Sequence, residues 1–241
     1  MKEPTYVLYR ILKTRREGIT APANCRLNAI LKRDGLESPD CVYIEKVAVR
    51  LAQTFHVPVA DGVLTDADGE LAFASLEVAA PRIPLPDLIQ SQFKKTAEKY
   101  PDQVAALLVF DILIGNRDRA SNLKAALNTP GVSLFRGFDH SHVLLNIEDT
   151  PEKSIAALKT PQLIVRFHPF FGLVMRVFLD LWVERIAAVD DRLVRECCVF
   201  GRKFQNVSST TQEALAEALL SRKNALVDIV SGHTDQIEPQ L

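Results

Sequence analysis

Residues 111–123 read DILIGNRDRASNL, and residues 138–142 read FDHSH. Their spacing predicts an apolar helix that ends near Gly115, followed by a polar loop that presents Asp118 and Asn122. A strand hairpin comes next, and its second strand, residues 132–138, is expected to deliver Asp139. Carboxylates beside apolar surface are costly unless a metal ion or hydrogen-bond donors compensate them. The segment therefore predicts a polar site at the end of a buried helix.

The order of these polar side chains matches a phosphoryl-transfer site. In kinases an Asp accepts the proton of the substrate hydroxyl, an Asn later in the same loop binds Mg²⁺, and an Asp after the next hairpin binds the metal that bridges the phosphates. Asp118, Asn122 and Asp139 occur in this order. The alternative is an ordinary loop, because Asp and Asn side chains often bond to the local backbone. The apolar segments on both sides favour the functional interpretation.

The run from Asn116 to Leu123, followed by residues 138–141, resembles the catalytic core of HipA-like kinases, a bacterial family related in fold to protein and phosphatidylinositol kinases. Residues 29–32 resemble the strand that supplies the lysine for the ATP phosphates. Glu45 and the apolar positions after it resemble the glutamate and the helix that pair with this lysine. The likeness extends over residues 6–229, and its motifs are short. It implies a two-lobed α+β kinase fold and a Ser/Thr protein kinase that depends on ATP and Mg²⁺.

The loop departs from the kinase pattern in its length. Protein kinases have four residues between the base and the metal-binding Asn, whereas three separate Asp118 from Asn122. Ala120 also stands where the family has a His. If the loop makes a tighter turn, Asn122 still reaches the metal and the protein is an active kinase. If Asn122 is misplaced, the protein has a kinase fold and binds nucleotide or a partner without phosphoryl transfer. A metal-dependent hydrolase that uses Asp118, Asp139 and His140 is a third hypothesis.

The active-kinase hypothesis assigns a role to each polar residue. Asp118 is the catalytic base, and Asn122 and Asp139 are the metal ligands. The residues assigned to nucleotide binding are Lys32, which contacts phosphates, Glu45, which orients Lys32, and Glu77, which opens the segment between the lobes. Taken singly, each of these three charges is typical of a solvated surface residue.

Several other residues have weaker assignments. The loop 16–22 occupies the place of a phosphate-covering loop, but it contains one glycine. Arg119 is expected to hold a phosphate, to pair with Asp139 or to lie on the surface. His140 is expected to shape the turn after Asp139, because a zinc site would need further ligands nearby. The core or the lobe packing is expected to contain His168 and Trp182.

Length and composition agree with the single two-lobed domain that the resemblance to kinases implies. The chain has 241 residues, of which 47% are hydrophobic, and this is enough for a sizeable core. The net charge of −1 gives no basic footprint for direct nucleic-acid binding. Residues 163–183 are apolar but carry charged interruptions, which predicts a buried helix and no membrane span. The four cysteines lack metal-ligand spacing and the N-terminus lacks an apolar signal core, so the expected location is cytoplasmic.

The predicted organisation is a small N-terminal lobe over residues 1–76, a hinge with three prolines over residues 77–87, and a helical C-terminal lobe over residues 88–241. Strands are expected at 6–12, 26–31, 62–65 and 71–75, and helices at 42–55, 102–114, 169–190, 191–200 and 212–230. Residues 208–211 are expected to cap the last helix, and residues 234–241 to be frayed. The expected partners are a nucleotide and a protein substrate. An antitoxin-like partner has no support in the sequence, because the chain is expected to begin close to the small lobe.

Overall fold

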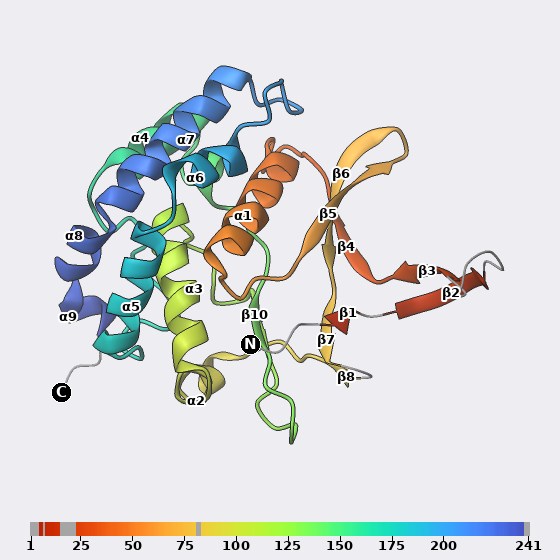
Figure 1. Ribbon diagram of the computed structural model, residues 1–241, viewed down its shortest axis with the longest axis horizontal. Coiled ribbons are helices and arrows are strands. Elements are labelled where there is room, and N and C mark those ends of the chain that lie inside the picture. The colour runs from red at the N-terminus through yellow and green to blue at the C-terminus, as the bar shows by residue number, and fades with distance from the viewer. Residues whose placement is uncertain (1–4, 7, 15–22, 81–82, 239–241) are drawn as a thin grey trace.

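The computed structural model describes residues 5–6, 8–14, 23–80 and 83–238. Short antiparallel strands lie on one side of a single helix in the N-terminal part, and the larger C-terminal part is mainly helical (Figure 1). This is the α+β arrangement that the sequence predicts. The expected phosphate-covering loop, residues 16–22, lies outside the described residues.

The elements of the N-terminal part have the following bounds: β1 (Thr5–Tyr6), β2 (Leu8–Thr14), β3 (Ala23–Leu27), β4 (Ala29–Lys32), α1 (Cys41–Phe55), β5 (Gly62–Ala67), β6 (Glu70–Leu76), β7 (Val78–Ala80) and β8 (Ile83–Pro84). Those of the C-terminal part are η1 (Gln90–Gln92), α2 (Phe93–Lys99), α3 (Pro101–Ile114), β9 (Leu123–Ala125), β10 (Phe135–Gly137), η2 (Leu144–Asn146), α4 (Pro151–Lys159), α5 (Arg176–Ala187), α6 (Asp191–Cys198), α7 (Ser209–Asn224), α8 (Leu226–Ser231) and α9 (Thr234–Ile237).

The strands of the N-terminal part exchange partners at one junction. β1 pairs with β7, β2 pairs with β3, and β4 pairs with β6, which also pairs with β5. Asn28 separates β3 from β4, and Glu77 separates β6 from β7. The Glu77 N–H donates to the Asn28 carbonyl at 3.0 Å, and Asn28 Nδ2 donates to Glu77 Oε2 at 3.1 Å. These two bonds fix the junction from which β4 carries Lys32 toward α1.

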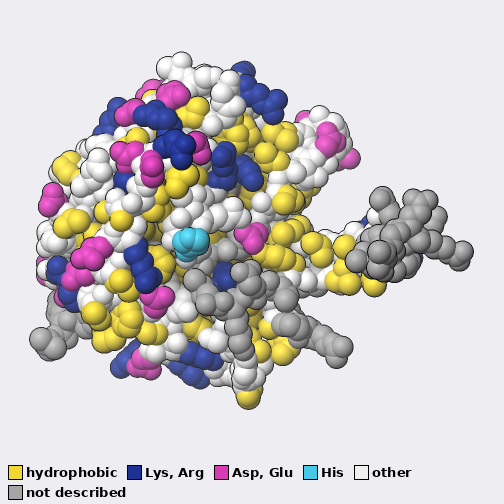
Figure 2. Space-filling view, viewed as in Figure 1, with side chains coloured by type: hydrophobic (Ala, Val, Ile, Leu, Met, Phe, Trp, Pro, Cys, Tyr) yellow, Lys and Arg dark blue, Asp and Glu magenta, His cyan; other side chains and the backbone are white. Residues whose placement is uncertain are grey.

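The β2–β3 hairpin projects from the body of the molecule (Figure 1). Figure 2 shows hydrophobic side chains along the neck that leads to it. Tyr9 is 67% exposed and Ile11 is 60% exposed. A two-stranded hairpin alone is marginally stable in water, so the hairpin contributes little to the stability of the fold.

Helix α1 carries Glu45 into the interior. Its apolar positions pack against β5 and β6 and against α6. The helix ends at His56, which takes the left-handed conformation at φ 58°. The expected helix 42–55 is confirmed, because the apolar residues recur with helical spacing along a face that is buried.

Helix α3 positions the loop that follows it. Every residue from Val104 to Ile114 is buried, and Gly115 ends the helix at φ 76°. A Cβ on Gly115 would lie 2.4 Å from Ile147 Cδ1, so both the backbone conformation and the packing require glycine. The predicted helix end near Gly115 is confirmed.

Five predicted boundaries are wrong. The strand expected at 26–31 is divided at Asn28 into β3 and β4, which pair with different strands. Helix α5 begins at Arg176 and not at Pro169, because turns occupy residues 169–174 and Gly172 is left-handed at φ 73°. The expected helix 212–230 is divided at Ala225 into α7 and α8. Residues 234–237 form α9 and bury Ile237, although they were expected to be frayed. The strand expected at 132–138 is shortened to β10.

Two smaller expectations concern a helix cap and the apolar stretch. Ser208 Oγ accepts the Thr211 N–H at 3.1 Å, which confirms the predicted cap of α7. Within the described residues, no helix combines the length and the apolar character that crossing a membrane requires.

Candidate active site

Lys32 lies at the end of β4 between two carboxylates. Its Nζ is 2.5 Å from Glu45 Oε1 and 2.7 Å from Asp139 Oδ1. The predicted Lys32–Glu45 pair is present, and Asp139 joins it. Burial alone would lower the pKa of Lys32, but the charges and hydrogen bonds of Glu45 and Asp139 raise it above its ordinary value. Lys32 is therefore a cation at neutral pH.

Glu45 connects α1 to the segment after β10. It is 1% exposed, and its Oε1 accepts the His140 N–H at 2.7 Å as well as Lys32. Burial would raise the pKa of Glu45, but the contacts with His140 and Lys32 hold it below its ordinary value. His140 is itself buried and packs edge-on against Phe110. The backbone of His140 thus ties the segment that carries Asp139 to the helix that carries Glu45.

Asp139 points its carboxylate toward Lys32 from a left-handed backbone conformation at φ 55°. Its Oδ1 also accepts the N–H of Ser141 at 3.1 Å and the Oγ–H of Ser141 at 2.8 Å. Burial would raise the pKa of Asp139, but the bonds from Lys32 and Ser141 hold it far below its ordinary value. Asp139 is an ionised carboxylate that needs a cation beside it.

The loop from Asp118 to Asn122 forms a tight turn. Asn122 Nδ2 donates to the Asp118 carbonyl at 2.7 Å and lies 3.4 Å from Asp118 Oδ2. The Phe138 N–H donates to the Asn122 carbonyl at 3.1 Å, which places Asn122 beside the residue that precedes Asp139. The loop that is one residue shorter than in protein kinases therefore still brings Asn122 next to Asp118 and close to Asp139. Because Nδ2 is used in the turn, Oδ1 is the amide atom left for a metal ion.

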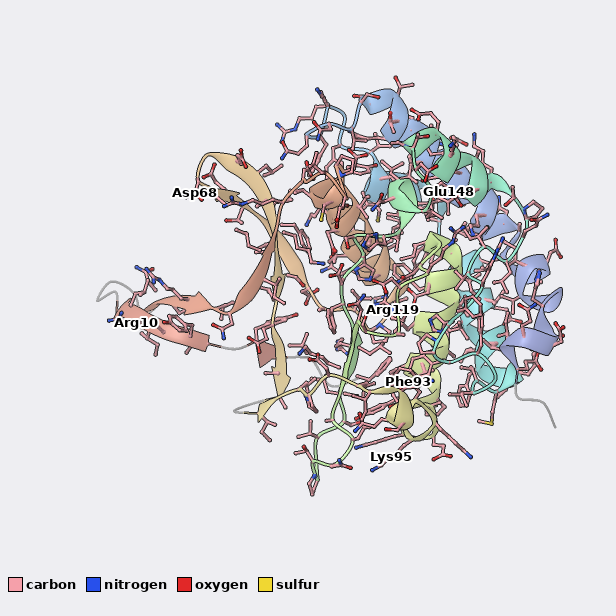
Figure 3. All side chains as sticks on the ribbon, turned by 180° about the vertical axis from the view of Figure 1, so that it is seen from behind. Arg10, Asp68, Phe93, Lys95, Arg119 and Glu148 are labelled. Carbon is pink, nitrogen blue, oxygen red and sulfur yellow. The ribbon has the colours of Figure 1, made fainter. Side chains whose placement is uncertain are left out.

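Arg119 fixes the loop through hydrogen bonds from the interior of the protein. It is 1% exposed and binds Asp111 through two bonds, at 2.8 Å from Nε and 2.9 Å from Nη2. Its Nη1 donates to the carbonyls of Phe138 at 2.7 Å and Asn122 at 3.2 Å. Figure 3 shows Arg119 between α3 and β10. The expectations that Arg119 holds a phosphate, pairs with Asp139 or lies on the surface are wrong, because its guanidinium group is buried and forms an ion pair with Asp111.

Asp111 and His168 complete this buried network, and the sequence analysis missed their roles. His168 Nε2 lies 3.0 Å from Asp111 Oδ2. Burial would raise the pKa of Asp111, but Arg119 and His168 hold it far below its ordinary value. Burial lowers the pKa of His168 despite Asp111. The informative feature was that Asp111 is the one charged residue in the apolar run 104–114.

Two clefts adjoin these residues. The first has a volume of about 700 Å³, and Ile30, Glu77, Val78, Lys124 and Phe138 are among its lining residues. Ile30 precedes Lys32 on the same side of its strand, and Phe138 precedes Asp139, so this cleft opens next to the charged cluster. The second has a volume of about 660 Å³, and its lining includes Asp118.

The donor set suits a hard divalent cation that prefers oxygen ligands. In the described part of the chain, no group of three or more His, Cys, Asp or Glu side chains could hold a metal by itself. Asn122 and Asp139 offer one amide oxygen and one carboxylate. Mg²⁺ in kinases is bound by one or two such groups and takes its other ligands from water and substrate phosphates. Hard oxygen donors in this small number fit Mg²⁺ and do not fit a structural zinc site.

Comparison with protein-family models gives no match, and comparison with curated proteins gives none either. Solved kinase structures are similar to this chain. The proinflammatory kinase CtkA of Helicobacter pylori has a TM-score of 0.58 at 15% identity, over 86% of this chain and 90% of that one. HipA of a Shewanella oneidensis MR-1 toxin–antitoxin system, solved with HipB and its operator DNA, has a TM-score of 0.59 at 14% identity, over 89% of this chain and 62% of HipA. At this identity the likeness shows the kinase fold, as the motifs predict.

Proposed function

We propose that the chain is an ATP- and Mg²⁺-dependent phosphotransferase of HipA-like type that acts on Ser or Thr hydroxyls of proteins. The observation that carries the proposal is the contact of Lys32 with both Glu45 and Asp139, at 2.5 and 2.7 Å. In active kinases a lysine paired with a glutamate of the adjacent helix and an aspartate at the metal are both required. A conformation with the helix swung outward would separate Lys32 from Glu45.

The first cleft is the place for the nucleotide. Ile30 and Val78 supply apolar surface, and Glu77 lies where β6 passes into β7. Bound ATP would supply the phosphoryl group, and bound Mg²⁺ would neutralise the negative charge of the phosphates. When nucleotide binds, Lys32 would contact a phosphate oxygen in place of Asp139. The Asp139 carboxylate and the Asn122 side chain would then be available to hold the metal. Segment 77–87 is the proposed hinge between a lobe of residues 1–76 and a lobe of residues 88–241.

Asp118 is the proposed general base. It is exposed, and it lines the second cleft, from which an acceptor hydroxyl can approach. The Asp118 N–H donates to Asn116 Oδ1 at 2.9 Å, which fixes the backbone of the residue that must accept the proton. The second candidate function is a nucleotide or partner binder without transfer, and the spacing of three residues between Asp118 and Asn122 favours it. The contact of Asn122 with Asp118 favours the active enzyme.

Binding of ATP tests the nucleotide site directly. Calorimetric titration of the purified protein with ATP is expected to show binding that depends on Mg²⁺. Asp139→Ala should abolish the Mg²⁺ dependence, because it removes the carboxylate that binds the metal. Asp68→Asn, at the exposed tip of the β5–β6 hairpin (Figure 3), is the control and should bind as the parent does. Equal Mg-ATP affinity of Asp139→Ala and the parent would show that Asp139 is only a turn residue.

A further inference from the structure

The second cleft, here called the acceptor cleft, places aromatic surface beside the proposed base. Its lining includes Gln90, Phe93, Asp118, Ser121, Phe167 and Phe171. Phe93 is buried and packs edge-on against Phe170 of the core, so it forms a fixed part of the wall. Phe167 is 85% exposed and therefore gains little from folding. Its ring is a large apolar surface left in water next to Asp118.

The charges of the acceptor cleft are almost all neutralised within the protein. Arg117 binds Glu148 at 2.9 Å and the carbonyls of Ile147 and Ile164 at 3.2 Å. The other two basic side chains of the lining, Arg119 and His168, both bind Asp111 in the interior. Among the described lining residues, Asp118 is thus the charged group that has no ion pair.

This distribution of charge indicates the chemistry of the acceptor. A polycationic small molecule would need several carboxylates around its hydroxyl, and the lining offers Asp118 alone. An acidic acceptor would need a free cation, and both arginines are already paired. A neutral group with a hydroxyl at Asp118 and an apolar side chain against Phe167 and Phe171 fits the lining.

We propose that the acceptor cleft takes a protein segment in which the phosphorylated Ser or Thr lies next to a large apolar residue, and that Phe167 selects this residue. The inference rests on the proposed function. In the transfer step the hydroxyl oxygen bonds to the γ-phosphorus while its proton passes to Asp118, and the bond from that phosphorus to the bridging oxygen of ADP breaks. Phe167 takes no part in this step. It orients the segment by burying the neighbouring side chain.

A peptide array tests this preference. Peptides with a central Ser carry Leu, Phe, Gly, Asp or Lys at the flanking positions, and transfer of labelled γ-phosphate is measured at equal peptide concentration. The parent is expected to favour Leu or Phe over Gly by roughly tenfold, the scale of a hydrophobic contact in a specificity pocket. Phe167→Ala should bring this ratio close to one. Val177→Ala, at a residue that is 66% exposed on α5, is the control and should keep the parent's ratio.

Binding gives a second readout that does not depend on transfer. Fluorescence anisotropy of a labelled Leu-flanked peptide should show weaker binding to Phe167→Ala than to the parent or to Val177→Ala. The inference is overturned if the parent labels all peptides equally, whatever the flanking residue. It is also overturned if Phe167→Ala keeps the parent's ratio of transfer to Leu- or Phe-flanked peptides over Gly-flanked peptides. Transfer to lipid vesicles or small hydroxyl compounds but to none of the peptides also overturns it, while phosphotransfer itself stands. Mg-ATP binding without transfer to any acceptor rejects the inference and the proposed function together.

Discussion

Arg119 joins three segments of the candidate site through one side chain. It binds Asp111 of α3, the carbonyl of Asn122 in the loop, and the carbonyl of Phe138 after β10. Removal of one member of a buried ion pair leaves an uncompensated charge, and this costs far more than the loss of an exposed pair. The position of Asp118 therefore depends on a cation whose bonds all go to Asp111 and to backbone carbonyls.

Arg119→Met is expected to lower the free energy of unfolding by about 3–5 kcal/mol, because Asp111 stays buried without its cation. Denaturant titration measures the loss. The control is Arg33→Met, which removes the exposed pair of Arg33 with Asp68 and should cost less than about 1 kcal/mol. Equal losses for the two variants would contradict the assigned role of Arg119.

The shifted pKa values predict how stability depends on pH. The pKa values of Glu45, Asp111 and Asp139 are lowered in the folded protein. Their stabilisation is thus fully present above the unfolded values near about 4 and is lost as pH falls toward the folded values. The pKa of Lys32 is raised, so its stabilisation is present below about 10.4 and is lost as pH rises through the folded value.

The lowered pKa of buried His168 adds a loss of stability as pH falls below its unfolded value near about 6.5, and the raised pKa values of buried Cys41 and Cys198 add a loss as pH rises above about 8.5. Denaturant titrations across pH are therefore expected to show the highest stability between about 6.5 and 8.5, and stability that rises on acidification from about pH 6 to about pH 2 would contradict the assignment.

At the residue scale, the sequence predicted the candidate site residues that belong to short motifs. Lys32, Glu45, Asp118, Asn122 and Asp139 all belong to short motifs. The structure brings Lys32, Glu45 and Asp139 into contact and places Asn122 beside Asp118, and a backbone bond from Phe138 to Asn122 links the two groups. Their catalytic roles remain proposals. The Asp111–His168 contact was not predictable in the same way, because the two residues are 57 positions apart and only the folded chain brings them together.

At the scale of elements, Gly115 fixes where α3 ends and where the loop of Asp118 begins. Gly115→Ala meets two costs: the left-handed conformation at φ 76° and a Cβ 2.4 Å from Ile147 Cδ1. Gly201 is also left-handed, at φ 67°, but a Cβ there has no neighbour within 4 Å. Gly201→Ala is therefore a control that carries the backbone cost alone.

The overpacking at Gly115 is expected to add about 1–3 kcal/mol to the destabilisation that both variants share. Thermal unfolding of the two variants beside the parent measures the difference. Melting temperatures that fall equally would mean that Ile147 moves aside freely and that packing does not fix the end of α3.

The elements differ in how far local sequence specifies them. Helix α3 was predictable because an apolar run with Asp111 as its one charged residue ends at a glycine. The beginning of α5 was not, because the apolar pattern continues through residues 169–175 although the left-handed Gly172 prevents a helix there. The exchange of strand partners at Asn28 and Glu77 also escaped prediction, because hydrogen-bond pairing between distant strands leaves no local pattern.

At the scale of the whole molecule, the charged cluster joins β4 and α1 of the N-terminal part to the segment that follows β10 in the C-terminal part. Lys32 and Glu45 come from the first part, and Asp118, Asn122 and Asp139 come from the second. Motion of one part relative to the other would therefore change the distances within the site. The kinase fold was predictable from the order of the motifs, whereas the orientation of the β2–β3 hairpin was not, because it depends on the junction at Asn28.

Transfer of labelled γ-phosphate tests the central proposal most directly. The parent, Asp118→Asn and the control Asp68→Asn are incubated with Mg²⁺ and γ-labelled ATP, alone and with a cell lysate, and labelled protein is counted. The parent and Asp68→Asn are expected to transfer equally. Asp118→Asn is expected to transfer at least roughly 10²-fold more slowly, because general-base catalysis contributes on this scale. Its ATP affinity should stay nearly unchanged. No transfer by the parent above background, or equal labelling by the parent and Asp118→Asn, would contradict the account.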